Sequence, residues 1–454
     1  MKKLKDFLID KCKNEGSLLG LSIRSGTSGM SLYNYFASAR LQPASNLKIL
    51  TAVAALRKLG PDYTFQTEVY CDGEIVNKGC HGNIYLVGKG DPTLQLKDYM
   101  QFAASIKEQG IRHIYGDFIL DDSWYDDIRW SEDLIWKDQQ YAYGSEVSAL
   151  TIAPDSDYDT NAIKLTIEPE KNNHPPNVEV SPHTEGISIT NEAITVEEAD
   201  EEELIVKRLN DENHFFISGK IGIKEGKQEV YMAIKDVENY IAKTIRHIFK
   251  STGIVLEGEI KRGKKKTDAK CIYRQQSLPL SSILIPFMKL SNNGIGEMLT
   301  KELGRIMYDD GSWESGIAAV KENLAPYRIN LDTIQLKDGS GISAANFIPA
   351  EELTHLLFEI QEENWFPEFL KSLPIAGEED KMVGGTLRKR MKGLEVRAKT
   401  GTIEGTSTLS GYLTNVNGER LIFSVLFNHL LDEDKGKELE DELIALLAVI
   451  ENWS

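Results

Sequence analysis

The pattern of apolar and polar positions divides the chain into helical ends and a strand-rich middle. Residues 46–58 carry apolar side chains at helical spacing until a Gly-Pro stop, which predicts a buried helix. Residues 65–95 alternate as strands do, and residues 161–230 are strand-like and acidic. A helical pattern returns over residues 231–255. The insertion of β-rich sequence between helical segments indicates more than one domain.

The C-terminal part of the chain predicts a sheet covered by a helix. Apolar strands are expected at residues 394–401, 407–415 and 420–429, with an Asn-Gly hairpin turn between the last two. Residues 437–453 place leucines along one helical face, which favours packing on that sheet; a membrane-surface helix is the alternative, weakened by an acidic polar face. These patterns predict an α+β fold in which both chain ends form one domain.

Composition narrows the classes of protein. A chain of 454 residues is expected to form roughly two or three domains. The formal charge of -18 argues against a nucleic-acid partner, and the basic run at 261–266 is expected to be a solvated turn rather than a site for an anionic polymer. No apolar run approaches the ~20 residues of a transmembrane helix, and the basic N-terminus shows no apolar core of a signal peptide.

Cysteine and histidine positions give no metal signature. No Cys-x-x-Cys or His-Glu-x-x-His occurs, so we expect no metal and no other cofactor. Cys71 and Cys80 flank a predicted hairpin and could meet across its strands, although two unpaired thiols are the preferred interpretation.

Ser45 and Lys48 form the first candidate for chemistry. They lie three positions apart at the start of the predicted helix and therefore share a face. A serine hydroxyl needs a base to act as a nucleophile, and a buried lysine with a lowered pKa can be that base. On this motif alone the simpler alternative, that Ser45 caps the helix, is favoured.

Two later motifs change that balance. Ser291 and Asn293 form a Ser-x-Asn motif between helical segments, and Lys399 begins a Lys-Thr-Gly motif at a strand end. Together with Ser-x-x-Lys, in this order, they are typical of penicillin-binding proteins and serine β-lactamases. We expect Ser291 to shuttle a proton between Lys48 and the leaving group, and Asn293 to orient Lys48 and hold a substrate amide. The alternative is a chance occurrence of three tripeptides.

The Lys-Thr-Gly strand has its own expected tasks. Lys399 would attract a substrate carboxylate and help to lower the pKa of the helix lysine, and Thr400 would hydrogen-bond that carboxylate. Gly401 would let the substrate approach the strand backbone. The backbone N–H groups of Ser45 and Thr402 would form the oxyanion hole.

The sequence resembles the low-molecular-mass class C penicillin-binding proteins, the D-alanyl-D-alanine carboxypeptidase/endopeptidase family S13. The resemblance runs from about residue 20 to 425 and includes "PASNLKILTAVAALRKLG", "GNIYLVGKGDPTL", "KLSNNGIGEMLTKELG", "DGSGIS", "GGTLRKR" and "RAKTGTIEGTSTLSGYL". Single-domain β-lactamases hold the first two motifs much closer together, whereas this family inserts β-rich domains between them.

The resemblance implies a domain organisation. A penicillin-binding, serine β-lactamase-like transpeptidase domain, with an antiparallel sheet and helices, would comprise residues 1–64 and 277–454. An inserted domain II would comprise residues 65–160 and 231–276, with a nested, mostly β domain III at residues 161–230.

The resemblance also suggests a site that determines substrate specificity. Asp138 and Tyr143 match a pair that, in family members from diaminopimelate-type walls, recognises the free amino-acid end of the stem-peptide side chain. The alternative is that both are ordinary loop residues.

The chain departs from the family pattern at one position. The family usually has an arginine after "DGSGLS", where this chain has Ala344.

The implied function is a serine DD-peptidase of the cell envelope. Ser45 would attack the carbonyl between two D-alanines of peptidoglycan stem peptides, and β-lactams would acylate the same serine. Two alternatives stay open: a β-lactamase or esterase on the same scaffold, and a non-catalytic peptidoglycan-binding or penicillin-sensing module. A Ser-His-Asp hydrolase is disfavoured because no histidine falls inside the motifs.

Overall fold

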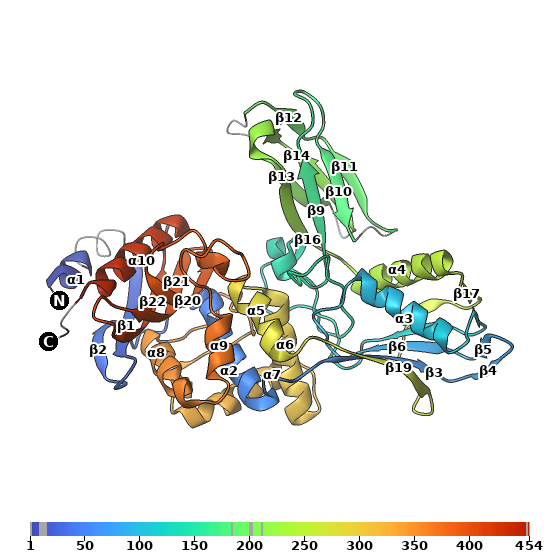
Figure 1. The fold of residues 1–454 in the computed structure, drawn as a ribbon, viewed down its shortest axis with the longest axis horizontal. Helices are drawn as coiled ribbons and strands as arrows, with labels where there is room; N and C mark the ends of the chain where they lie inside the picture. The colour runs from blue at the N-terminus through green and yellow to red at the C-terminus, as the bar shows by residue number, and fades with distance from the viewer. Residues whose placement is uncertain are drawn as a thin grey trace. The chain divides into compact units, whose positions relative to one another are not determined.

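The fold is described from a computed structural model, which covers residues 2–8, 16–182, 185–198, 203–209, 212–450 and 453 (Figure 1). Residues 9–15 of the N-terminal segment and residues 199–202 of the acidic stretch lie outside the described residues. The chain forms two compact units. The first comprises Met1–Tyr63, Ser131–Asp133 and Pro279–Ser454, and the second comprises Thr64–Trp130 and Leu134–Leu278. Both chain ends therefore belong to one unit.

The first unit is built on a five-stranded sheet with the order β2-β1-β22-β21-β20 and antiparallel neighbours throughout. Its strands are β1 (Leu18–Ser25), β2 (Ser31–Tyr35), β20 (Glu395–Ile403), β21 (Thr406–Thr414) and β22 (Arg420–Asn428). Its helices are α1 (Lys2–Phe7), α2 (Lys48–Leu59), α5 (Leu280–Lys289), α6 (Asn293–Tyr308), α7 (Trp313–Leu324), α8 (Ala350–Glu359), α9 (Phe366–Ser372) and α10 (Glu433–Ala448).

Helices cover both faces of this sheet (Figure 1). Leu21 and Ile23 of β1 share an apolar core with Leu439 and Leu443 of α10. The alternate residue Ser22 points to the other face, where its hydroxyl pairs with Thr354 of α8 at 2.8 Å. The three C-terminal strands and the packing of the last helix on them confirm the sequence prediction, and the β21–β22 hairpin turns at the Asn-Val-Asn-Gly stretch.

The described residues of the second unit form several small sheets, together with the α-helices α3 and α4. One five-stranded sheet has the order β18-β8-β6-β3-β19, and one four-stranded sheet has the order β17-β7-β5-β4. Their strands are β3 (Gln66–Cys71), β4 (Glu74–Val76), β5 (Gly79–His81), β6 (Ile84–Gly88), β7 (His113–Ile114), β8 (Phe118–Asp121), β17 (Val255–Leu256), β18 (Ile260–Arg262) and β19 (Lys270–Gln276). The helices α3 (Leu96–Glu108) and α4 (Val237–Thr252) belong to the same apolar core.

Three further sheets of this unit come from the strand-like, acidic stretch: β10-β9-β16, β11-β14-β13 and β12-β15. Their strands are β9 (Ala162–Glu168), β10 (Asn177–Ser181), β11 (Ser188–Asn191), β12 (Ile194–Val196), β13 (Ile205–Leu209), β14 (His214–Ser218), β15 (Lys220–Gly222) and β16 (Gln228–Ala233).

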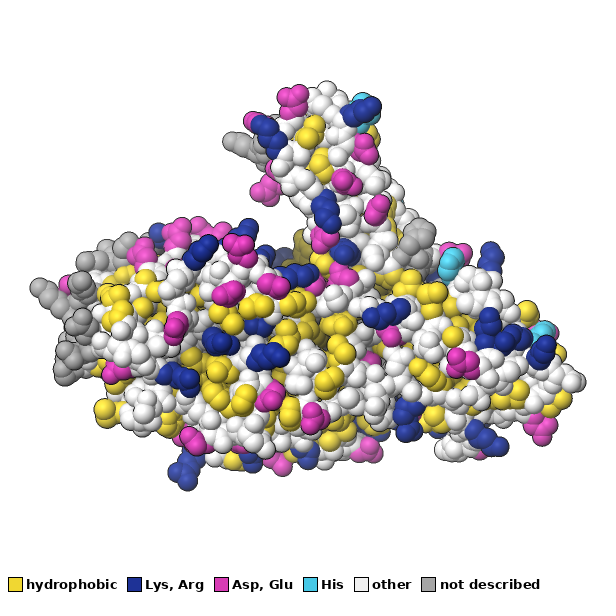
Figure 2. Space-filling model, in the orientation of Figure 1, with side chains coloured by type: hydrophobic (Ala, Val, Ile, Leu, Met, Phe, Trp, Pro, Cys, Tyr) yellow, Lys and Arg dark blue, Asp and Glu magenta, His cyan; other side chains and the backbone are white. Residues whose placement is uncertain are grey.

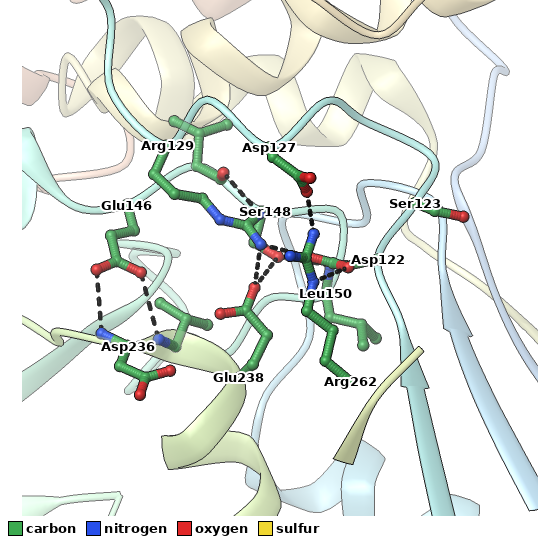
Figure 3. Close-up of polar contacts among 12 residues, drawn as sticks. Asp122, Ser123, Asp127, Arg129, Glu146, Ser148, Leu150, Asp236, Glu238 and Arg262 are labelled. Atoms are coloured by element: carbon green, nitrogen blue, oxygen red, sulfur yellow. Dashed lines mark hydrogen bonds and ion pairs between the residues drawn. The ribbon is translucent and has the colours of Figure 1, made fainter. Parts of the chain in front are cut away.

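The helix predicted at residues 231–255 begins later than expected. Residues 231–233 belong to β16, which pairs with β9, and the helix α4 starts at Val237. The start is fixed by two carboxylates: Asp236 accepts from Asn239 N at 3.2 Å, and Glu146 accepts from Asp236 N at 3.0 Å (Figure 3). The apolar residues before this cap fill the sheet instead of a helix face.

The basic run at 261–266 is paired with acids of its own unit. Lys261 lies 2.6 Å from Asp117, and Lys266 lies 2.7 Å from Asp72. Figure 3 shows Arg262 between Asp122 and Asp127. In the view of Figure 2, acidic and basic side chains are interspersed over the surface. This pairing favours the solvated turn over a site for an anionic polymer.

The Cys71 and Cys80 side chains do meet, as the hairpin prediction allowed. Both are buried, and their Sγ atoms lie 3.0 Å apart as free thiols. Within the part of the chain that the structure describes, no helix combines the length and apolar character needed to cross a bilayer.

Candidate active site

Ser45 lies in a short 3-10 helix, Ala44–Leu47, that leads directly into α2. Neither helix start shows a side-chain cap bond, so Ser45 does not cap the helix. Its Oγ instead accepts a hydrogen bond from Lys48 Nζ at 2.8 Å. The residue before it, Ala44, has a φ of +45°, a conformation that non-glycine residues rarely adopt and that is often found at functional sites.

Lys48 is fully buried and has three acceptors around its amine. Nζ lies 2.8 Å from Ser45 Oγ, 2.7 Å from Asn293 Oδ1 and 2.8 Å from the carbonyl oxygen of Ser340. Burial disfavours the charged amine and lowers the Lys48 pKa to about 7, against the opposing effect of nearby carboxylates. A lysine in this state can accept a proton from a neighbouring hydroxyl near neutral pH.

Ser291 and Asn293 lie at the junction between α5 and α6. Ser291 has a φ of +62°, and Asn292 caps α6 by accepting from Ile295 N at 3.1 Å. Asn293 is then the first residue of α6, and its side chain reaches Lys48. The sharp turn before the cap places the Ser291 hydroxyl beside Lys399 rather than beside α6.

The Lys-Thr-Gly motif lies on β20, the last strand of the sheet order. Lys399 is fully buried, and its Nζ donates to Ser291 Oγ at 2.9 Å and to Thr400 O at 2.6 Å. Burial, followed by the charge of Lys48, lowers the Lys399 pKa well below its ordinary value. The sequence prediction that Lys399 lowers the Lys48 pKa is not seen: burial lowers the pKa of Lys48, and the charge effect between the two lysines appears at Lys399 instead.

β20 packs closely against the turn that holds the serine. A Cβ added to Gly401 would lie 2.7 Å from Ser45 N and 2.9 Å from Pro43 O, so only glycine fits there. Thr402, the next residue, continues the strand opposite Ser407 of β21. An edge strand of this kind can accept an extended peptide beside it.

The structure brings together the residues of all three motifs, with Lys48 and Lys399 at the centre. It places Asp138 and Tyr143 in the second unit, where Tyr143 Oη donates to Asp138 Oδ1 at 3.1 Å. Ala344, the departure from the family pattern, is exposed, and its carbonyl oxygen accepts from Gln42 Nε2 at 2.9 Å.

Two contacts of the site were missed by sequence reasoning. The Ser340 carbonyl holds Lys48, and the Thr386 hydroxyl lies 2.7 Å from Thr400 Oγ1. Ser340 lies within "DGSGIS" and Thr386 lies within "GGTLRKR", two of the stretches that carry the family resemblance. Their place in these stretches was the signal that could have identified them.

Comparison with known proteins gives a family match over nearly the whole chain. Residues 1–450 match the D-Ala-D-Ala carboxypeptidase 3 (S13) family. A D-alanyl-D-alanine carboxypeptidase of Actinomadura sp. (strain R39) is 33% identical over 430 residues, which cover 93% of this chain and 80% of that protein.

Two solved structures share the fold. Penicillin-binding protein 4 of Haemophilus influenzae is 24% identical with a TM-score of 0.83, and 99% of this chain and 100% of that chain are covered. A second structure of that protein, complexed with a β-lactam, is 25% identical with a TM-score of 0.76 and covers 99% of both chains. On the whole-chain family match and the 33% identity across most of both proteins, this chain belongs to the D-Ala-D-Ala carboxypeptidase 3 (S13) family of serine peptidases.

Proposed function

We propose that the chain is a serine DD-peptidase that hydrolyses the D-alanyl-D-alanine bond of peptidoglycan stem peptides through an acyl-enzyme on Ser45. One observation supports this above all: the buried amine of Lys48 lies 2.8 Å from Ser45 Oγ. This pair supplies a nucleophile and its base. The three sequence motifs contain no histidine that could act as the base instead. The name and activity of the Actinomadura relative point to the same reaction.

In the acylation step, Lys48 takes the Ser45 proton as Oγ attacks the carbonyl of the penultimate D-alanine. Negative charge then develops on the carbonyl oxygen, and the backbone N–H groups of Ser45 and Thr402 would stabilise it. The close packing of Gly401 on Ser45 N supports this assignment, since it brings the strand and the serine turn together.

The leaving D-alanine needs a proton on its nitrogen. Ser291 Oγ accepts from Lys399, so its own O–H proton can point at the leaving nitrogen. The proton that Lys48 took from Ser45 would then replace it on Ser291. Water then hydrolyses the acyl-enzyme with Lys48 as base. The proton balance closes because each proton taken from Ser45 or water is returned to D-alanine or to Ser45.

Lys399 and Thr400 would bind the terminal carboxylate of the substrate. The amine of Lys399 is buried beside the strand. The Thr400 hydroxyl donates to Thr386 Oγ1 at 2.7 Å and would turn to donate to the carboxylate. A bound carboxylate would favour the charged form of Lys399 and so offset its lowered pKa. A β-lactam carries a carboxylate and a reactive amide at the same positions, so it would acylate Ser45 in place of the peptide.

The reaction should follow the protonation of Lys48. Because the base form is the active form, kcat/KM for release of D-alanine should rise through about pH 7 and level off above it. A lysine with the ordinary pKa of 10.5 would delay the rise to strongly alkaline pH. The measurement is D-alanine release from a peptide ending in D-Ala-D-Ala, from about pH 5 to about pH 9. Ser45→Ala is the control and should release none. A flat profile for the wild-type protein would contradict the role of Lys48.

We further propose that Asp138 and Tyr143 recognise the free amino-acid end of a diaminopimelate-type side chain. Their mutual hydrogen bond holds the Asp138 carboxylate in one orientation, suited to an ammonium group. Asp138→Ala should raise KM about tenfold for a peptide with a free side-chain amine, equivalent to about 1.4 kcal/mol. The same peptide with an acetylated amine is the matched control and should be processed equally by both proteins. Equal losses on both peptides would mean that Asp138 only supports the loop and does not bind the side-chain amine.

Cleavage of peptide cross-links is the same chemistry on a different amide bond, so the proposed function includes endopeptidase activity.

The separate sheets formed by residues 162–233 support a nested domain III within domain II. The family is a periplasmic and cell-wall class, which supports an extracytoplasmic site of action at the cell envelope.

A further inference from the structure

A lysine that acts as a base must direct its nitrogen lone pair at the proton it takes. A neutral amine keeps two N–H donors and one lone pair. If the two donors of Lys48 serve Asn293 Oδ1 and Ser340 O, the lone pair faces the third partner, Ser45 Oγ. The direction of proton transfer thus depends on how firmly the Ser340 carbonyl is held.

One buried carboxylate holds the backbone that leads to the Ser340 carbonyl. Glu297 lies on α6, one turn after Asn293, and its side chain faces the same loop. Its Oε1 accepts from Ser340 N at 3.0 Å, and its Oε2 accepts from Gly339 N at 3.0 Å. Trp313 Nε1 of α7 donates to Oε2 at 2.7 Å. Glu297 therefore fixes the two peptide groups that lead to the Ser340 Cα. The carbonyl that reaches Lys48 belongs to the next peptide group, Ser340–Gly341, whose N–H donates to Asp338 Oδ1 at 2.7 Å.

The other side of this loop is held by the helix that contains Lys48. Gly339 O accepts from Thr51 Oγ1 of α2 at 2.7 Å. A Cβ added to Gly339 would lie 1.9 Å from Thr300 Oγ1 of α6, so the backbone rests directly on that helix. The helices α2, α6 and α7 pack against one another around this point (Figure 1).

Charged side chains from several elements surround Lys48. Burial lowers the Lys48 pKa, and the carboxylates of Glu297 on α6 and Asp338 in the loop oppose that effect. Lys399 approaches from β20. Lys301, one turn after Glu297, lies 3.8 Å from the centre of the Trp313 ring. Removal of the Glu297 charge would therefore lower the Lys48 pKa further.

We propose that Glu297 is a positioning residue for the reaction: it binds the two backbone amides that precede the Ser340 carbonyl, sets the position of that carbonyl and so aims Lys48 at Ser45. The inference rests on the proposed function, because it assumes that Ser45 is acylated.

The test compares three variants by their second-order rate of acylation with a fluorescent penicillin, from about pH 5 to about pH 9. Glu297→Gln offers one acceptor oxygen and no charge, so acylation should fall about 10- to 100-fold and its rise with pH should move to lower pH. Glu297→Asp keeps the charge but is one methylene shorter, so acylation should slow with the wild-type pH dependence. Glu314→Gln removes an exposed carboxylate from α7 and should stay close to wild type in both respects.

The pH dependence separates positioning from general damage to the fold. A Glu297→Gln protein that is slowed by one factor at every pH, or not slowed at all, would overturn the inference. If Glu297→Gln does not fold by circular dichroism, Glu297→Asp decides alone: a wild-type rate would overturn the inference. Failure of the wild-type protein to be acylated would instead contradict the proposed function, so the two failures are distinguishable.

Discussion

Replacing Lys48 with alanine is expected to lower the rate of acylation by a β-lactam about 1,000-fold, the middle of the range for loss of a general base. The amine that should take the Ser45 proton is lost, and Asn293 Oδ1 and Ser340 O lose their donor. The measurement is the second-order acylation rate at about pH 8, where the Lys48 pKa of about 7 leaves the wild-type base neutral.

Two matched variants sharpen this prediction. Lys48→Arg keeps a cation but cannot be deprotonated in a protein, so it should be as slow as Lys48→Ala. Lys58→Ala removes an exposed lysine from the last turn of the same helix and should acylate at the wild-type rate. A folded Lys48→Arg protein with wild-type acylation would show that proton removal does not depend on this amine.

Replacing Lys399 with alanine is expected to lower kcat/KM for peptides ending in D-Ala-D-Ala about 100-fold. Two effects combine: the substrate carboxylate loses a buried cation, and Ser291 loses the donor that orients its hydroxyl. The two can be separated with a peptide whose C-terminal carboxylate is converted to an amide.

The amide-ended peptide should be a poor substrate for the wild-type protein and should lose much less from the Lys399→Ala change. Ser291→Ala serves as the matched control, because it removes the hydroxyl and keeps the cation. It should slow both peptides by the same factor. If Lys399→Ala preserves the wild-type preference for the carboxylate, the proposed carboxylate contact is wrong.

The contacts that sequence could predict are those set by local spacing. Ser45 and Lys48 lie three residues apart on one helical face, so their hydrogen bond follows from helix geometry. The strand that contains Lys399 follows from its apolar alternation and from the hairpin beyond it. The order of the motifs then indicated that these segments meet, although spacing alone does not show how.

The contacts that sequence could not predict join distant residues through backbone atoms. Ser340 is 292 residues from Lys48, and its carbonyl has no side-chain signature. The start of α4 was misplaced because the apolar residues before Val237 suit a strand and a helix equally. The pairing of Ser291 with Lys399 depends on a left-handed turn at Ser291 that no tripeptide motif specifies.

The central claim, that Ser45 is acylated, is tested most directly by mass spectrometry after incubation with benzylpenicillin. Trypsin should cut after Arg40 and Lys48, which isolates Ser45 in the peptide Leu41–Lys48. The wild-type protein should gain the mass of the intact drug on this peptide, and Ser45→Ala should gain none. An adduct on another peptide, or one that persists in Ser45→Ala, would contradict the claim. Rapid loss of the drug without an adduct would instead favour a β-lactamase.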